Sequence, residues 1–148
     1  MTVPPLNANG LLPIGIHPAT LDEIRERFGT FQDSDRRPKL FARLVELVQA
    51  ARRNGLFEEL LINGSFATAK ASPNDIDILA VVKPGHDFER DLPMSEYNLV
   101  SRTLLRRRYG FDIVVAERSS EVYKSYVELF SRVRDAPVLR KGLLRLQL

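Results

Sequence analysis

The sequence contains no cysteine, which excludes disulfide bonds and thiolate metal sites and fits a reducing compartment such as the cytoplasm. It has no apolar run near the roughly 18 residues of a membrane span, so we expect no membrane partner. The N-terminus lacks the basic start and apolar core of a signal peptide. The chain has 148 residues, of which 44% are hydrophobic and 28% charged, and these values are typical of one globular domain. We therefore expect a cytoplasmic protein that buries a core without crosslinks.

The net charge of +3 is unevenly distributed along the chain. Residues 1–100 carry 11 basic and 14 acidic side chains, whereas residues 101–148 carry 11 basic and five acidic ones. A basic final third favours a polyanionic partner such as RNA or the phosphates of a nucleotide, but a solvated basic surface explains it equally well. The same two interpretations hold for Arg140, Lys141 and Arg145, which either bind a partner or serve solubility.

Hydrophobic periodicity predicts an α/β (α+β) fold with a small mixed β-sheet flanked by helices. Helices are expected at about 21–28, 38–54, 94–108 and 120–134, and strands at 60–62, 76–82 and 111–117. Thr20 and Glu23 form a capping box before the first helix. We expect residues 1–19 to form an extended N-terminal segment, residues 20–136 the domain, and residues 137–148 a basic arm or a strand. The histidines, His17 and His86, are expected in loops without a catalytic role.

Two carboxylates stand at the entry to the expected strand 76–82. Residues i and i+2 of a strand point to the same face, so Asp75 and Asp77 should project together. Two bare carboxylates about 4 Å apart repel by roughly 4 kcal/mol at an effective dielectric near 20, which a proton or a cation must relieve. Oxygen-only ligands favour Mg²⁺. Asp75 by itself could instead cap a turn after Pro73 and Asn74.

A third acid and a Gly-Ser pair complete the pattern. Asp112 lies in the otherwise apolar strand expected at 111–117, although aspartate is uncommon in β-strands. If this strand lies beside strand 76–82, the three carboxylates can hold two metal ions around a reacting phosphate. Gly64 and Ser65 end the preceding strand, where backbone amides and a hydroxyl can form a nest for an anion. The ordered set predicts a site for a metal-bound nucleoside triphosphate.

The same set resembles the signature of the nucleotidyltransferase superfamily that includes DNA polymerase beta. That signature is a Gly-Ser after a strand, then Asp-x-Asp, then an acid on a later strand, matched here by Gly64, Ser65, Asp75, Asp77 and Asp112. More narrowly, nearly the whole chain is similar to small stand-alone bacterial nucleotidyltransferase-like proteins, through the segments LLPIGIHPATLDEIRERFG, GSFATAKASPNDIDI and KGLLRL. The resemblance implies a minimal nucleotidyltransferase fold over residues 20–136.

The resemblance also implies roles for these residues. The three aspartates would hold two Mg²⁺ ions and carry catalysis, and Gly64 and Ser65 would bind the nucleotide. The family pattern carries Arg-Gly in the loop that here reads FATAKASPN, about one residue shorter. Lys70 either replaces that arginine as a nucleotide-binding residue or is a solvated loop lysine.

The implied function is transfer of a nucleoside monophosphate from an NTP to a hydroxyl of RNA, including tRNA, or of a partner protein. Related proteins often belong to toxin–antitoxin or phage-defence pairs, so a cognate toxin or antitoxin is an expected partner. The alternative is a catalytically inactive antitoxin or regulatory binding protein with the same fold. A sugar-transferring enzyme that uses Asp-x-Asp is disfavoured, because such enzymes generally need more chain for an acceptor domain.

Overall fold

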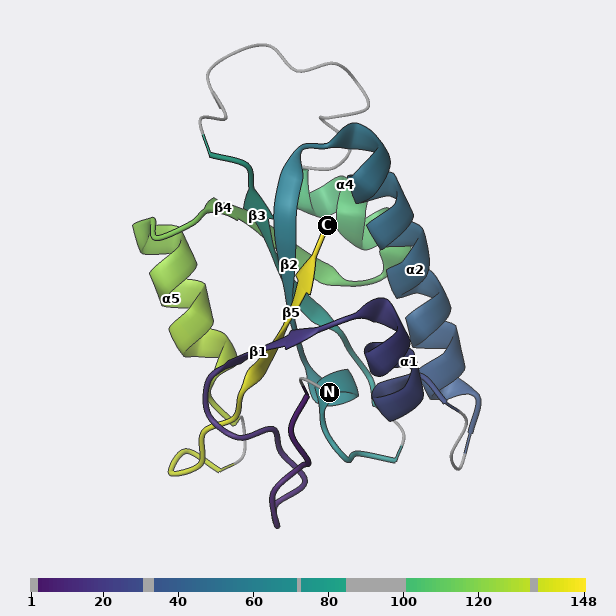
Figure 1. Ribbon diagram of the computed structural model, residues 1–148, viewed down its shortest axis with the longest axis vertical. Helices are drawn as coiled ribbons and strands as arrows, with labels where there is room; N and C mark the ends of the chain where they lie inside the picture. Colours follow the sequence, from purple (N-terminus) through teal and green to yellow (C-terminus); the bar gives the residue numbers. More distant parts are fainter. Residues whose placement is uncertain (1–2, 31–33, 72, 85–100, 134–135) are drawn as a thin grey trace.

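The computed structural model describes residues 3–30, 34–71, 73–84, 101–133 and 136–148, which form an α+β fold around one mixed sheet (Figure 1). The strands are β1 (Ile16–Ala19), β2 (Phe57–Asn63), β3 (Asp77–Val82), β4 (Asp112–Glu117) and β5 (Leu143–Gln147). Their order across the sheet is β1-β5-β2-β3-β4. The helices are α1 (Leu21–Phe28), α2 (Arg36–Asn54), α4 (Arg102–Tyr109) and α5 (Glu121–Phe130), with a short 3-10 turn, η1 (Ser65–Ala67).

Helices cover both faces of the sheet. Helices α1, α2 and α4 lie on one face and α5 on the other (Figure 1). Because alternate residues of a strand point to opposite faces, Ile78 and Ile113 pack in the larger core under α2, while Leu79 and Val114 pack under α5. In the described ranges no helix combines the length and the apolar character that a membrane crossing requires.

Most of the elements expected from the sequence are present. The capping box begins α1, since the Thr20 hydroxyl accepts from the Glu23 amide at 3.1 Å. Helix α2 ends before Gly55, whose φ of 65° suits a residue without Cβ. Of the helix expected at 94–108, residues 94–100 lie outside the described residues, as does His86, and α4 accounts for the rest. Helix α5 ends at Phe130, earlier than expected.

The two terminal segments join the sheet. Residues 16–19, expected to be part of an extended lead-in, form β1 and pair in parallel with β5. His17 therefore lies in a strand and not in a loop, and its Nε2 is 2.7 Å from the Pro13 carbonyl oxygen. Within residues 137–148, expected as a basic arm or a strand, Leu143–Gln147 form β5, which lies between β1 and β2. Leu143, Leu144 and Leu146 of this strand are buried in the cores.

Candidate functional site

Three polar residues form a row across neighbouring strands of the sheet. Asn63 of β2 is the register partner of Asp77 of β3, and Asp77 is the register partner of Asp112 of β4. Register partners carry their side chains on the same face, so all three lie on the α5 face. Further along the strands, this face continues with the apolar Leu61 and Leu79. We call Asn63, Asp77 and Asp112 the polar row.

The Gly64–Ser65 turn lies directly against the segment that carries the two aspartates. Gly64 has a φ of 90°, and a Cβ there would lie 2.8 Å from the Asp75 carbonyl oxygen and 3.0 Å from the Asp77 amide nitrogen. Only glycine permits this backbone conformation together with this close approach. The turn and the polar row are therefore held together by the backbone itself.

Asp75 accepts hydrogen bonds from the turn. Its Oδ1 accepts from the Ser65 amide at 2.9 Å and from the Ser65 hydroxyl at 2.8 Å. The Ser65 Oγ in turn accepts from the Asn74 amide at 3.0 Å. Strand β3 begins at Asp77, so Asp75 precedes the strand and the alternation argument does not apply to it. In this structure the Ser65 amide and hydroxyl, the groups expected to donate to a phosphate, donate instead to Asp75.

Two arginines at the start of α2 fix the loop between Ser65 and Asp75. The Arg37 side chain is only 1% exposed and donates to the carbonyls of Phe28, Phe66, Thr68 and Lys70 at 3.0, 2.7, 2.7 and 2.5 Å. Arg36 donates to the carbonyls of Pro73 and Asn74 at 2.8 and 2.9 Å. Burial lowers the pKa of Arg37, but the side chain stays cationic at neutral pH. The sequence did not predict this role, because nothing local distinguishes Arg37 from its neighbours.

Lys70 lies at the exposed tip of this loop. Its carbonyl oxygen accepts from Arg37, while its ammonium group makes no hydrogen bond or ion pair within the described part of the chain. The structure thus does not bring the Lys70 side chain into contact with the polar row.

Arg102, the first residue of α4, binds the carboxylate of Asp112. Its Nε lies 2.8 Å from Oδ1 and its Nη2 lies 2.7 Å from Oδ2. Its Nη1 also lies 3.4 Å from the Tyr126 hydroxyl of α5. The hydrogen bond to Asp112 raises the pKa of Arg102 above its usual value. A hollow of about 470 Å³ opens beside this pair, lined by Arg102, Thr103, Arg106, Arg107 and Asp112.

Lys141 approaches the other side of the site, just before β5. Burial lowers the pKa of its ammonium group, and the nearby charges of Asp77 and Asp75 act in the opposite direction. The position is set by Gly142, where a Cβ would lie 2.0 Å from the Pro13 carbonyl oxygen. A side chain at Gly142 would thus displace the N-terminal segment, so glycine is required for the chain to place Lys141 here.

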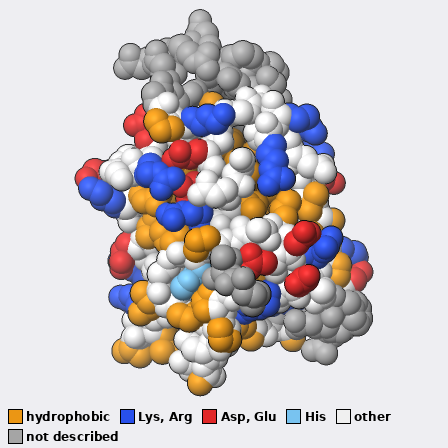
Figure 2. Space-filling view, viewed as in Figure 1, with side chains coloured by type: hydrophobic (Ala, Val, Ile, Leu, Met, Phe, Trp, Pro, Cys, Tyr) orange, Lys and Arg blue, Asp and Glu red, His pale blue; other side chains and the backbone are white. Residues whose placement is uncertain are grey.

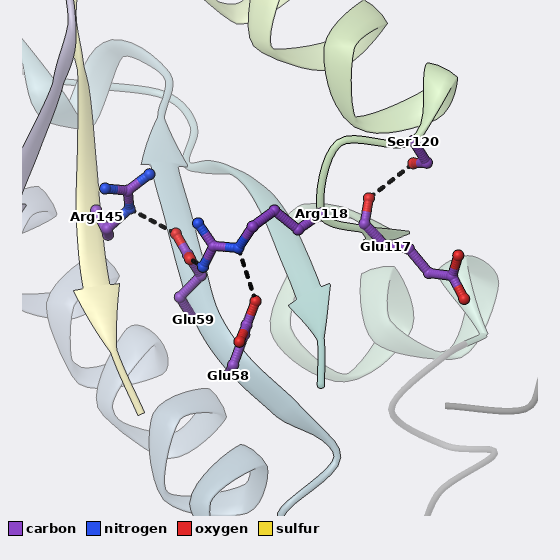
Figure 3. A network of polar contacts seen from close by, with 6 residues as sticks. All are labelled: Glu58, Glu59, Glu117, Arg118, Ser120 and Arg145. Atoms are coloured by element: carbon purple, nitrogen blue, oxygen red, sulfur yellow. Dashed lines mark hydrogen bonds and ion pairs between the residues drawn. The ribbon is translucent and has the colours of Figure 1, made fainter. Parts of the chain in front are cut away.

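Arg145 does not act together with Lys141, although the sequence suggested one basic arm. It binds Glu59, a fully buried carboxylate, with its Nε 2.7 Å from Oε2 (Figure 3). Arg118 binds the other oxygen of Glu59 and also Glu58, at 2.9 Å. Two guanidinium groups thus compensate one buried charge, at the opposite end of β2 from Asn63. In Figure 2 the basic side chains form separate groups interspersed with acidic ones.

The donor chemistry of the polar row fits a hard divalent cation. Asp77 and Asp112 offer carboxylate oxygens, and the buried Oδ1 of Asn63 has no hydrogen-bond partner. An all-oxygen set suits Mg²⁺ and not a metal that prefers thiolate or imidazole ligands. Within the described ranges, however, no three His, Cys, Asp or Glu side chains are already arranged around a common ion position. Binding at Asp112 would require Arg102 to move.

Comparison with known proteins places the chain in a family without assigning it an activity. No curated protein and no solved structure matches it. Residues 4–147 match the family described as "Family of unknown function (DUF6932)", and the chain therefore belongs to that family.

Proposed function

We propose that the protein is an Mg²⁺-dependent nucleotidyltransferase that moves a nucleoside monophosphate from an NTP to a hydroxyl group. The observation that carries this proposal is the register pairing of Asp77 with Asp112, on one face of the sheet and beside the Gly64–Ser65 turn. Two adjacent carboxylates repel each other unless a cation balances their charge; Arg102 does this for Asp112 in the structure, and Mg²⁺ would replace it there. The glycine turn next to them offers an amide and a hydroxyl for phosphate oxygens.

Each residue then has a defined task. Mg²⁺, when bound by Asp77 and Asp112, would neutralise the charge of the triphosphate. The Ser65 amide and hydroxyl exchange their bonds to Asp75 for bonds to phosphate oxygens. Asp112 accepts the proton of the acceptor hydroxyl, whose oxygen bonds to the α-phosphorus while the bond to the pyrophosphate oxygen breaks. Lys141 lies close enough to the aspartates to contribute positive charge on the side opposite Arg102.

The hollow along α4 supports RNA, including tRNA, as the acceptor. It contains Asp112 itself and is lined by Arg102, Arg106 and Arg107, so an acceptor bound there would meet positive charge next to the proposed base. Phosphates of an RNA strand are the natural complement of such a surface. A hydroxyl of a partner protein, for example a cognate toxin or antitoxin, is the alternative acceptor and would lack that complementarity.

The test is transfer of label from each α-³²P-labelled NTP, with Mg²⁺, to total RNA or to cell protein. We expect Asp77→Asn and Asp112→Asn each to reduce transfer at least a hundredfold with an unchanged circular dichroism spectrum. Glu117→Gln is the matched control, because Glu117 is an exposed acid at the far end of the same strand as Asp112. Transfer by Asp77→Asn at the wild-type rate would refute the proposal.

One observation favours a second candidate, a catalytically inactive antitoxin or regulatory binding protein. Arg102 holds both oxygens of Asp112, and Ser65 donates to Asp75, so these two aspartates already bind groups of the protein itself. If this arrangement is permanent, no NTP will serve as donor, and Asp77→Asn will bind partners as well as the wild type. The labelling experiment separates the two candidates directly.

A further inference from the structure

We propose that the side-chain oxygen of Asn63 is a third ligand of the divalent cation held by Asp77 and Asp112, an inference that rests on the proposed function. No role for Asn63 was predicted from the sequence, where an asparagine before a glycine is typical of a turn. Its assignment comes from the position of the side chain in the sheet and from the state of its oxygen atom.

The register of β2 places Asn63 in the polar row. It is the direct cross-strand partner of Asp77, whose other partner is Asp112. Side chains of such partners leave the sheet on the same face, with Cβ atoms about 4.5–5.5 Å apart. The amide oxygen of Asn63 therefore lies on the same side of the sheet as the carboxylates, next to Asp77.

The second, independent observation is that this oxygen is buried without a hydrogen-bond partner. Asn63 is 3% exposed, and its Oδ1 has no hydrogen-bond partner. Buried polar atoms are nearly always paired, and an unpaired acceptor lowers the stability of the fold. On the same face of β2, Leu61 fills the preceding position in an apolar core. Leucine, whose side chain has the same branched arrangement of four heavy atoms, is the apolar counterpart expected at position 63 if packing alone decided the residue.

A cation supplies the missing partner. Amide and carboxylate oxygens are both ligands for Mg²⁺ and Mn²⁺. A neutral oxygen also has an electrostatic advantage here, because a third carboxylate beside Asp77 would add repulsion to the metal-free fold. Asn63 thus gives a third ligand without a third negative charge, and the cost is one unpaired buried atom when no ion is bound.

The experiment measures Mn²⁺ binding by the full chain, from the electron paramagnetic resonance signal of free Mn²⁺, together with thermal unfolding with and without the ion. We expect Asn63→Leu to weaken Mn²⁺ binding at least tenfold and to raise the metal-free melting temperature. Asn63→Asp should tighten Mn²⁺ binding several-fold and lower the metal-free melting temperature. The control is Asn54→Leu at the end of α2, where the asparagine donates to the Ala50 carbonyl and precedes the start of β2, the strand that Asn63 ends.

Wild-type Mn²⁺ affinity in Asn63→Leu, a lower metal-free melting temperature for that variant, or no Mn²⁺ binding by the wild type would each overturn the inference. If Asn63→Leu does not fold, Asn63→Asp decides, and unchanged affinity there overturns it. The two proposals fail separately. If Mn²⁺ binding depends on Asn63 but no NTP serves as donor, the proposed nucleotidyltransferase activity is refuted and the cation site remains. If nucleotide transfer occurs and Mn²⁺ binding does not depend on Asn63, only the assignment of Asn63 as a ligand is refuted.

Discussion

Arg102 binds both carboxylate oxygens of Asp112, at 2.8 and 2.7 Å, and so occupies the atoms that a cation in the polar row would need. The Arg102 side chain is 55% exposed and that of Asp112 is 28% exposed. An ion pair this open to water contributes only about 0–1 kcal/mol to stability. The pair can therefore open at little cost when a cation or a nucleotide competes for Asp112.

Replacing Arg102 with glutamine should free Asp112 and tighten the binding of Mn²⁺ several-fold. The free energy of unfolding should fall by less than about 1 kcal/mol, since the pair is exposed. Arg106→Gln removes the same charge from the same helix, in a residue that lines the hollow without binding Asp112. Equal Mn²⁺ affinities for Arg102→Gln and Arg106→Gln would show that the ion pair does not compete with the cation.

Replacing Arg37 with methionine should destabilise the protein by about 3–5 kcal/mol, because the four carbonyl groups that it binds would lose a charged donor in the interior. The measurement is the free energy of unfolding in urea. Arg43→Met, an exposed position in the middle of α2, should change it by no more than about 0.5 kcal/mol. Similar values for the two variants would contradict the role assigned to Arg37 in holding the loop.

Lys141 and Arg140 are adjacent in the sequence but should differ in function. Lys141→Met removes the ammonium group next to Asp75 and Asp77 and should weaken the binding of an NTP at least tenfold, measured by isothermal titration calorimetry with Mg²⁺ present. Arg140 donates to the carbonyls of Pro137 and Leu139, so Arg140→Met should leave NTP affinity within twofold of the wild type. An equal loss in both variants would restore the idea of a single basic arm.

Glu59 should matter for stability and not for ion binding. Glu59→Gln leaves the partly exposed Arg118 and Arg145 facing a neutral amide, which should lower the free energy of unfolding by about 1.5–3 kcal/mol, the usual contribution of hydrogen bonds to a charged group. Glu58→Gln removes only the more exposed partner of Arg118 and should lower it by less than about 1 kcal/mol. Both variants should bind Mn²⁺ as the wild type does, and a loss of binding in either would indicate that the two ends of β2 are coupled.

The carboxylates of the candidate site stand out in the sequence because aspartate is rare in strands whose other residues are apolar. Asp77 and Asp112 each begin a segment that is otherwise apolar, and the structure places those segments side by side as expected. Gly64 also stands out in the sequence, because a glycine at the end of a strand indicates a backbone conformation that other residues rarely adopt. All three residues are recognised from their immediate neighbours in the chain, which a single sequence is enough to show.

The other residues of the site depend on long-range contacts. Arg102 and Lys141 are ordinary basic residues until the fold brings them to the aspartates, and only burial distinguishes Arg37 from Arg36. Strand β1 is short and contains Pro18, which suits an edge strand but gives no strand signal of its own. The central position of β5 could not be inferred, because nothing local tells a chain segment which strands will flank it.

The position of β5 also constrains how the protein reaches its folded state. This strand joins β1, from the opposite end of the described chain, to β2, so the sheet closes through contacts between segments far apart in sequence. Such contacts form slowly, because the chain must lose the conformational entropy of a long loop before the contacts between its ends can stabilise the fold. Until β5 inserts, β2 presents a bare hydrogen-bonding edge to other chains. We expect incompletely folded molecules at high concentration to aggregate through that edge before β5 covers it.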